Sequence, residues 1–349
     1  MRKLFFGVGL IVLLAGIGCS RGGARGADGG VFKSSDAGAS WSQAVAVLSA
    51  RGVGSAAGAN ILSLVADPSD PFTLYAGTEG QGLIFSYDGA ASWQQPREGV
   101  LRTGAVTAVA VDPTEKCRVY VAKSDRIFRT DDCNRTFGEE IYVEGKAGVF
   151  VTGLAVDWFS GESVYAALSD GRLLKTSDYG ANWTTVFRGR QAITRLLISN
   201  LDSRVVVLGM LGGGFARSTD GGLTWAPILD QLKPYRDANR VFGLVQDAQG
   251  ERMMAATGYG VLTSEDQGDS WRPLKLLSAP GEVMVNAVGI DPAEKDHMLY
   301  AVGNALYETR DAGEHWAVQK LATSRLIRTI LFDSSNSETI YIGMRAVQQ

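Results

Sequence analysis

The sequence predicts an all-β fold, a seven-bladed β-propeller with four-stranded blades, on the basis of three observations. An eight-residue pattern, Ser/Thr-x-Asp-x-Gly-x-Ser/Thr-Trp, recurs seven times in complete or degenerate form. Each copy after the first follows short β-rich segments separated by turn residues, and no stretch after residue 18 shows a sustained helical period of apolar residues. The first and last repeats are each incomplete, and together they make one whole repeat.

The spacing of the pattern sets the size of the repeating unit. Successive aspartates are 52, 44, 46, 42, 46 and 45 residues apart. This matches a four-stranded propeller blade and exceeds the period of ankyrin or tetratricopeptide units. The unbroken repeat favours one propeller domain over residues 30–349. The aspartates at the third position of the pattern are Asp36, Asp88, Asp132, Asp178, Asp220, Asp266 and Asp311.

The two chain ends are expected to share one blade. Leu326–Met344 contains only the first two strands of a repeat, whereas Gly30–Val47 contains only the last two. Pairing the two segments closes the ring and removes the exposed sheet edge that invites aggregation. The sequence therefore predicts that residues 327–344 pair with residues 31–47.

Each residue of the pattern has a local structural reason. The aspartate can accept backbone N–H groups of a tight turn, the glycine supplies a positive φ, and the tryptophan is expected to be buried between sheets. Asn134 replaces the glycine in the third copy. In Ser86–Trp93 the glycine is shifted to Gly89, which predicts a distorted turn. Because seven equivalent turns use the same residue, we interpret the aspartates as structural rather than catalytic or metal-binding.

This pattern resembles the Asp-box, or bacterial neuraminidase repeat. It is similar to repeats of sialidases, sortilin-type receptors, oligoxyloglucan-acting glycoside hydrolases and photosystem II assembly-factor propellers. The resemblance implies that the boxes lie on turns between third and fourth strands, away from the binding face. The Phe/Tyr-Arg-Ile-Pro motif of sialidases is absent from the sequence. The xyloglucan enzymes place their cleft between two seven-bladed rings, and this sequence predicts one.

The N-terminus predicts a lipoprotein of the cell envelope. Residues 1–18 contain Arg2 and Lys3 and then an apolar run, as in a secretory leader, and Gly18-Cys19 resembles the end of a bacterial lipobox. We expect Cys19 to carry lipid that anchors the protein to a membrane, with residues 19–29 as a flexible tether. Ordinary secretion with an incidental Cys19 is the alternative. Whether the membrane is the inner or the outer one stays open.

Cys117 and Cys133 are expected to form a disulfide. They make an even pair in an oxidising compartment, and they lie in two turns on the same face of one predicted blade. A zinc site is not expected, because two cysteines without a convergent histidine supply too few ligands.

Composition and motifs favour a binding protein over an enzyme. With 34 Lys and Arg against 37 Asp and Glu, the chain carries no nucleic-acid signature. His297 is placed in a surface turn and His315 in the last box, and no phosphate loop or nucleophile elbow occurs. Glycoside hydrolysis needs two placed carboxylates, and the sequence offers no argument for such a pair. We expect a monomer without cofactor or metal.

The candidate binding residues lie mainly in loops on the face opposite the boxes, and Arg195, Arg240 and Arg328 fall near the starts of inner strands, where side chains can reach the central funnel. Loops that a rigid scaffold positions often carry function. The hypothesis is that this face binds an acidic segment of a protein partner or an anionic glycan; a glycan-binding or hydrolase-like protein is the alternative. On the box face, Trp158 either docks a partner or is buried between blades. The candidates are Arg190, Arg195, Tyr235, Arg236, Arg240, Arg328 and Trp158.

Overall fold

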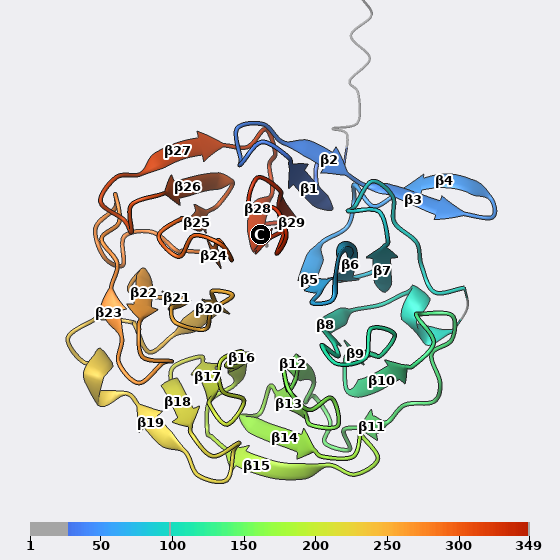
Figure 1. The fold of residues 1–349 in the computed structure, drawn as a ribbon, viewed down its shortest axis with the longest axis horizontal. Coiled ribbons are helices and arrows are strands. Elements are labelled where there is room, and N and C mark those ends of the chain that lie inside the picture. Colours follow the sequence, from blue (N-terminus) through green and yellow to red (C-terminus); the bar gives the residue numbers. More distant parts are fainter. Residues whose placement is uncertain (1–26, 98, 348–349) are drawn as a thin grey trace, which may run out of the picture.

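Seven β-sheets are arranged around a central axis in the computed structural model, which describes residues 27–97 and 99–347 (Figure 1). In this part of the chain the only helices are two short 3-10 turns, Val100–Arg102 and Asp230–Leu232. The predicted all-β, seven-bladed propeller is therefore confirmed. The predicted leader, lipid site and most of the tether lie outside the described residues.

Each blade follows the chain from its inner strand to its outer strand. The strands of blades 1 to 3 are β5 (Ile61–Asp67), β6 (Asp70–Thr78) and β7 (Leu83–Ser86); β8 (Val106–Val111), β9 (Val119–Lys123), β10 (Arg126–Thr130) and β11 (Tyr142–Val143); and β12 (Val151–Val156), β13 (Val164–Leu168), β14 (Arg172–Thr176) and β15 (Thr184–Arg188). The strands of blades 4 to 6 are β16 (Ile193–Ile198), β17 (Val206–Met210), β18 (Gly214–Ser218) and β19 (Ala226–Ile228); β20 (Val241–Gln246), β21 (Met253–Thr257), β22 (Val261–Ser264) and β23 (Arg272–Pro273); and β24 (Ala287–Ile290), β25 (Met298–Val302), β26 (Ala305–Thr309) and β27 (Ala317–Lys320).

Blade 7 joins the two ends of the chain. Its sheet has the order β2-β1-β29-β28, with β28 (Leu326–Phe332) and β29 (Ile340–Arg345) from the C-terminal end and β1 (Val31–Ser34) and β2 (Ser42–Ala44) from the N-terminal end. β1 and β29 are antiparallel, with Phe32 opposite Ile342. The composite closing blade is confirmed, and the ring has no open seam.

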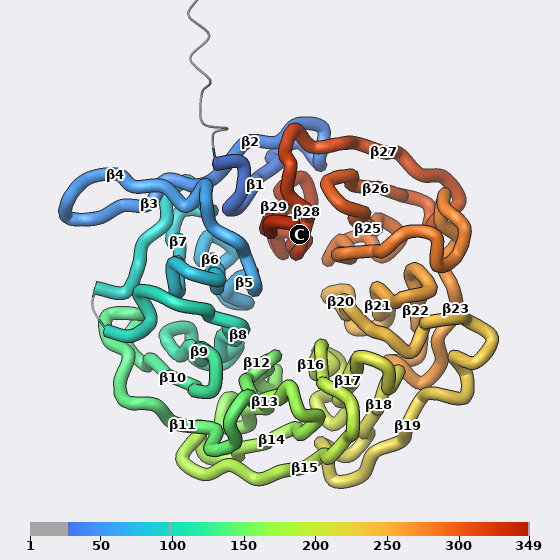
Figure 2. The backbone as a smooth tube through the Cα atoms, turned by 180° about the vertical axis from the view of Figure 1, so that it is seen from behind, coloured from blue at the N-terminus to red at the C-terminus, as the bar shows by residue number. Residues whose placement is uncertain are grey.

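Blade 1 departs from the regular plan. A hairpin of β3 (Ala46–Ser49) and β4 (Gly52–Ser55) projects from the ring, as both views show (Figures 1 and 2). The position of the fourth strand is taken by a short segment around Gln94, which pairs with β7. The preceding residue, Trp93, forms a parallel bridge with Val47 of β3. The hairpin therefore extends the sheet of blade 1 outward.

The second strands form the middle of the core between blades. Five of them carry a fully buried tyrosine at the same position. Tyr165 of blade 3 donates a hydrogen bond of 2.8 Å to the carbonyl of Gly221, in the box of blade 4. Tyr341 of blade 7 reaches the carbonyl of Gly89 in the box of blade 1 in the same way, at 3.3 Å. These two tyrosines thus pack their rings between two sheets and tie their hydroxyls to the neighbouring blade, whereas the buried hydroxyls of Tyr120 and Tyr300 have no partner among the described residues.

The box turns differ in one respect from the expectation. The two residues after each aspartate both have positive φ, for example 65° at Gly89 and 64° at Ala90. The shifted glycine of this second box therefore occupies the first left-handed position, and Ala90 accepts the second. Its turn keeps the hydrogen bonds of the others, with the Ala90 N–H donating to the Ser86 hydroxyl at 2.9 Å. The predicted distortion of this turn is wrong, because either position accepts the glycine.

Candidate functional site

The carboxylates of the boxes are fully used within their own turns. In the first box, Asp36 Oδ1 accepts the Ser34 hydroxyl at 2.7 Å and the Ser40 N–H at 2.8 Å, and Oδ2 accepts the Ser40 hydroxyl at 2.5 Å. Hydrogen bonds of this kind, first from the Thr176 hydroxyl, lower the pKa of Asp178 to about 2. A carboxylate held this strongly in its charged form is a poor general acid.

The box turn is also tied to the turn between the first two strands of its blade. The N–H after the box aspartate donates to a carbonyl of that turn, as from Ala37 to Glu338 at 2.8 Å. The structure joins Cys117 and Cys133 by a disulfide at this same junction in blade 2. Cys133 and the following Asn134 take the two positive-φ positions, at 56° and 65°. Blade 2 thus adds a covalent link where the other blades rely on hydrogen bonds.

His297 does not lie in an exposed turn, and its sequence-based placement is wrong. The side chain is 1% exposed. Its Nδ1 lies 2.7 Å from Asp291 Oδ2, and its Nε2 lies 3.0 Å from Glu308 Oε1. The hydrogen bond from His297 lowers the pKa of Glu308. Ser337 of blade 7 donates to Asp291 at 2.7 Å, so this buried chain of polar groups links blades 6 and 7.

Trp158 belongs to the core between two blades rather than to a docking surface. Its indole N–H donates to the Ile198 carbonyl of blade 4 at 3.0 Å, and its ring packs against the core of that blade. The structure therefore supports the second of the two interpretations. Its neighbour Phe159 is 64% exposed.

The exposed arginine candidates gather around blade 4. Arg190 lies in the connection from β15 to β16, whereas Arg236 and Arg240 lie in the connection from β19 to β20, and all three are exposed. The hairpin turn of β17 and β18 lies between these connections: Leu211 donates its N–H to the Ala192 carbonyl at 3.0 Å and bridges to Arg240. We call Arg188, Arg190, Arg236 and Arg240 the blade-4 arginine surface.

This surface is rigid and carries excess positive charge. Tyr235 is partly buried, and the centre of its ring lies 5.2 Å from that of Tyr259. Its side chain thus packs the β19–β20 connection against the core. The guanidinium of Arg240 lies 5.5 Å from the centre of the Phe242 ring, within the range of a cation–π contact. In the β19–β20 connection Asp237 lies 3.4 Å from Arg236, and Asp230 pairs with Lys233. Two acidic groups thus face four basic ones in these two connections, and Arg188 at the end of β15 adds a fifth basic group.

Arg195 and Arg328 occupy a different place, near the centre of the ring. They lie on the inner strands β16 and β28, next to β-bulges that interrupt the register of both strands. Burial, together with the nearby charge of Arg328, lowers the pKa of Arg195 to about 9. The structure therefore brings these two candidates together and separates them from the exposed loop arginines.

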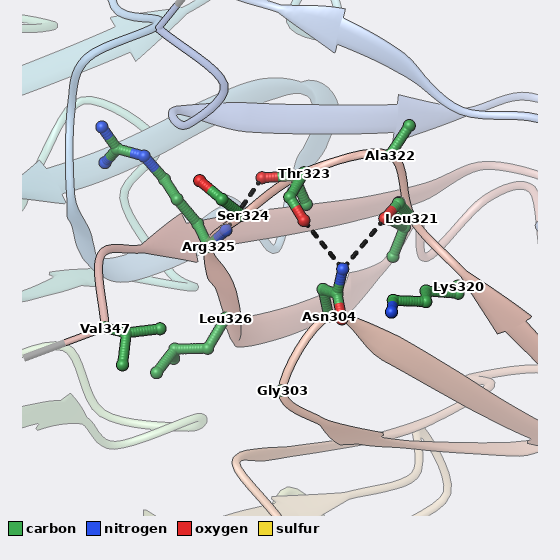
Figure 3. A pocket seen from close by; sticks show the side chains of 10 residues that line it. All are labelled: Gly303, Asn304, Lys320, Leu321, Ala322, Thr323, Ser324, Arg325, Leu326 and Val347. Carbon is green, nitrogen blue, oxygen red and sulfur yellow. Dashed lines mark hydrogen bonds between the residues drawn. The ribbon is translucent and has the colours of Figure 1, made fainter. Parts of the chain in front are cut away.

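The surface hollows hold few carboxylates. A depression of about 660 Å³ lies beside blades 6 and 7. In it Asn304 donates to the carbonyls of Leu321 and Thr323 (Figure 3). Its only charged lining residues are Lys320 and Arg325. Arg325 points away toward the first described residues of the chain, where Asp28 accepts the Ser324 N–H at 2.6 Å. The lining of this hollow, among the described residues, offers no carboxylate pair.

A hollow on the box face contains both Asp36 and Glu308. Asp36 is held by its own box, and Glu308 lies 3.0 Å from His297 and 2.7 Å from Arg310. Both groups are therefore occupied. Within the described residues no cluster of three or more His, Cys, Asp or Glu side chains is placed to hold a metal ion, and no helix there is long and apolar enough to cross a membrane.

The closed ring of seven blades and the geometry of the box turns are those of a seven-bladed β-propeller with turns that resemble Asp-boxes. A family model described as photosynthesis system II assembly factor YCF48 matches residues 203–345 of this propeller, which is less than half of the chain. A curated xyloglucanase from Hypocrea jecorina (strain QM6a) is 28% identical over 171 residues, 46% of this chain. The chain spans only 20% of the length of that relative.

Solved structures of two kinds resemble the propeller. A GH74 xyloglucanase from Xanthomonas campestris superimposes with a TM-score of 0.66 and 18% identity, over 82% of this chain and 51% of that one. A structure described as YCF48 bound to D1 peptide gives 0.63 and 17%, over 83% and 94%. YCF48 from Cyanidioschyzon merolae gives 0.61 and 13%, over 82% and 95%. At these identities the likeness concerns the fold alone.

Proposed function

We propose that this propeller is a non-catalytic lipoprotein of the cell envelope that binds an acidic segment of a protein partner through the blade-4 arginine surface. The observation that carries the proposal is the group of exposed arginines on two short connections that a central hairpin holds together. Preorganised guanidinium groups lose little conformational entropy when they bind carboxylates, and they bind them bidentately. The resemblance to assembly-factor propellers supports a protein partner.

The test uses a defined acidic ligand. Fluorescence anisotropy would measure binding of a labelled peptide of twelve alternating Glu and Gly residues to the mature chain at two salt concentrations. Arg190→Glu/Arg236→Glu/Arg240→Glu is expected to abolish binding. The matched control, Lys116→Glu/Arg135→Glu/Arg204→Glu, changes the net charge equally on the box face and is expected to keep it. Equal loss in both variants would show that only net charge matters and would contradict the proposal.

The membrane anchor needs a separate experiment. The proposal places lipid on Cys19, ahead of a tether that ends where Asp28 is held by blade 7. Labelled palmitate should enter the protein in cells, and Cys19→Ala should remove both the label and the membrane association. A labelled Cys19→Ala variant, or an unlabelled wild type that stays in the envelope fraction, would contradict this part.

The second candidate function is binding or hydrolysis of an extracellular polysaccharide. It is favoured by the xyloglucanase matches, one of which reaches 28% identity. Incubation of the purified chain with xyloglucan, followed by measurement of new reducing ends and of retention on an immobilised xyloglucan column, separates this candidate from the first. Release of reducing ends would make the chain an enzyme, whereas retention without release would make it a glycan-binding module.

A further inference from the structure

Two half-buried arginines lie at the ring centre with most of their N–H donors unpaired among the described residues. Inner strands β16 and β28 face each other across the ring, and they carry Arg195 and Arg328 (Figure 1). Arg328 lies at the bulge between Ile327 and Thr329, where β28 has an extra residue relative to β29. The same bulge occurs in six of the seven inner strands, so the residue type, not the bulge, sets Arg195 and Arg328 apart.

Most donors of these two guanidinium groups are unused within the described residues. Arg195 donates one hydrogen bond, from an Nη atom to the Thr194 carbonyl at 2.6 Å. The Nε of Arg328 is buried and has no hydrogen-bond partner. An arginine carries five N–H donors, and leaving a buried charged donor unpaired costs more than leaving a neutral one.

The surrounding residues at the ring centre do not supply the missing acceptors. The residue at the bulge and the residue directly after it can be compared across the seven inner strands. At these two positions Arg195 and Arg328 are the only charged residues. Three threonines at these positions already donate their hydroxyls to the next blade, as Thr107 does to the Val151 carbonyl at 2.7 Å. Such ties hold neighbouring blades together.

A third arginine, Arg345, adds positive charge near Arg328 and pairs with Glu79. Burial lowers the pKa of Arg328, and the charge of Arg345 lowers it further. The nearest carboxylate of Arg345 is Glu79, at 3.7 Å. Both Arg195 and Arg328 keep partial contact with solvent, so a small solute can reach them. Both guanidinium groups stay charged at neutral pH.

We infer that the ring centre binds a small multivalent oxyanion between Arg195 and Arg328, a site separate from the blade-4 arginine surface. The forked donors of each guanidinium match two oxygens of a phosphate or a polycarboxylate. A ligand with two or more negative charges offsets the repulsion between the two arginines and satisfies the buried Nε of Arg328. A peptide partner on the exposed loops does not explain that buried donor.

Isothermal titration calorimetry with inorganic phosphate and, separately, citrate tests this inference on the mature chain in an anion-poor buffer. Arg328→Gln and Arg195→Gln are each expected to weaken binding at least tenfold, and the double variant is expected to abolish it. Arg204→Gln, which alters an exposed arginine on the box face, is the matched control and should bind as the wild type does. The phosphate and citrate arms identify which oxyanion geometry the site prefers.

Thermal unfolding gives a readout that a merely structural role would not move. Phosphate or citrate should raise the melting temperature of the wild type and leave that of Arg328→Gln unchanged. Without the anion, Arg328→Gln should be at least as stable as the wild type, because it removes an unpaired buried charge. A variant that is less stable without the anion yet still stabilised by it would overturn the inference.

A last variant distinguishes an external ligand from the end of the chain itself. Gln348 and Gln349 lie outside the described residues, close in sequence to β29. A chain that ends at Val347 should bind phosphate as the full chain does. Binding by the shortened chain alone would mean that the terminal carboxylate fills the site, and no binding by either chain would mean that the site takes no such ligand; both results overturn the inference.

Discussion

The two faces of the ring differ in whether their charged side chains have partners. On the box face, each box aspartate accepts hydrogen bonds from its own turn, and buried groups such as His297 are paired on both sides. On the opposite face and at the ring centre, Arg190 and Arg240 are exposed, and Arg328 has a buried donor without a partner. The repeated aspartates of the first region are satisfied within their turns, which fits a structural role, whereas the arginines of the second region are where we propose that ligands bind.

The largest expected effect comes from the aromatic residue that ends a box. Trp93 is fully buried, and its indole N–H donates to the Ala44 carbonyl at 2.8 Å. Trp93→Ala should lower the free energy of unfolding by about 3–5 kcal/mol, because it leaves a cavity and an unpaired carbonyl. Urea unfolding followed by circular dichroism measures the loss. Phe159→Ala, an exposed aromatic on the same face, should change stability by less than about 0.5 kcal/mol.

The disulfide of blade 2 should have the next largest effect. Cys117 and Cys133 are separated by 16 residues. Cys117→Ser/Cys133→Ser should lower the free energy of unfolding by about 3 kcal/mol, because the unfolded chain regains the freedom of that loop. Chemical denaturation of the variant and of the reduced wild type should agree. Two reactive thiols in the native, unreduced protein would contradict the bond itself.

The hydrogen-bonded box aspartates predict how the stability of the folded protein falls at acid pH. Hydrogen bonds within the box lower the pKa of Asp178, Asp220 and Asp311 from 3.8 to about 2 in the folded state. A depressed folded pKa adds stability above the unfolded value, and this is lost as pH falls through the folded value. Urea midpoints should therefore drop between about pH 4 and pH 2. Asp178→Asn/Asp220→Asn should flatten that dependence; an unchanged slope would count against the boxes as its source.

The smallest effect on stability, and the sharpest contrast, is expected at the blade-4 arginine surface. Arg236→Gln removes a side chain that is 95% exposed and should change the free energy of unfolding by less than about 0.5 kcal/mol. Acidic-peptide affinity should nevertheless fall severalfold in the anisotropy assay. A variant that loses stability without losing affinity would place Arg236 with the structural residues and weaken the contrast between the two faces.

The sequence was a good guide wherever a residue's role is local. The box turn, the closing blade and the position of the disulfide all follow from spacing and turn chemistry, since their partners lie within one repeat or at the two chain ends. It was a poor guide for His297 and Trp158. Both lie in turns, which are usually exposed, but neighbouring strands bury His297 and an adjacent blade partly buries Trp158. Contacts between blades join residues far apart in the chain, so no local pattern reports them.

The sequence by itself thus determined the number of blades, the composite blade at the seam and the structural role of seven aspartates, because a repeated turn requires the same residues each time. The sequence grouped Arg240 with Arg195 and Arg328, near the starts of inner strands from which side chains can reach the central funnel. The tertiary structure instead leaves Arg240 exposed beside Arg190 and Arg236. It places only Arg195 and Arg328 at the ring centre, where burial and mutual repulsion change what each charge can bind.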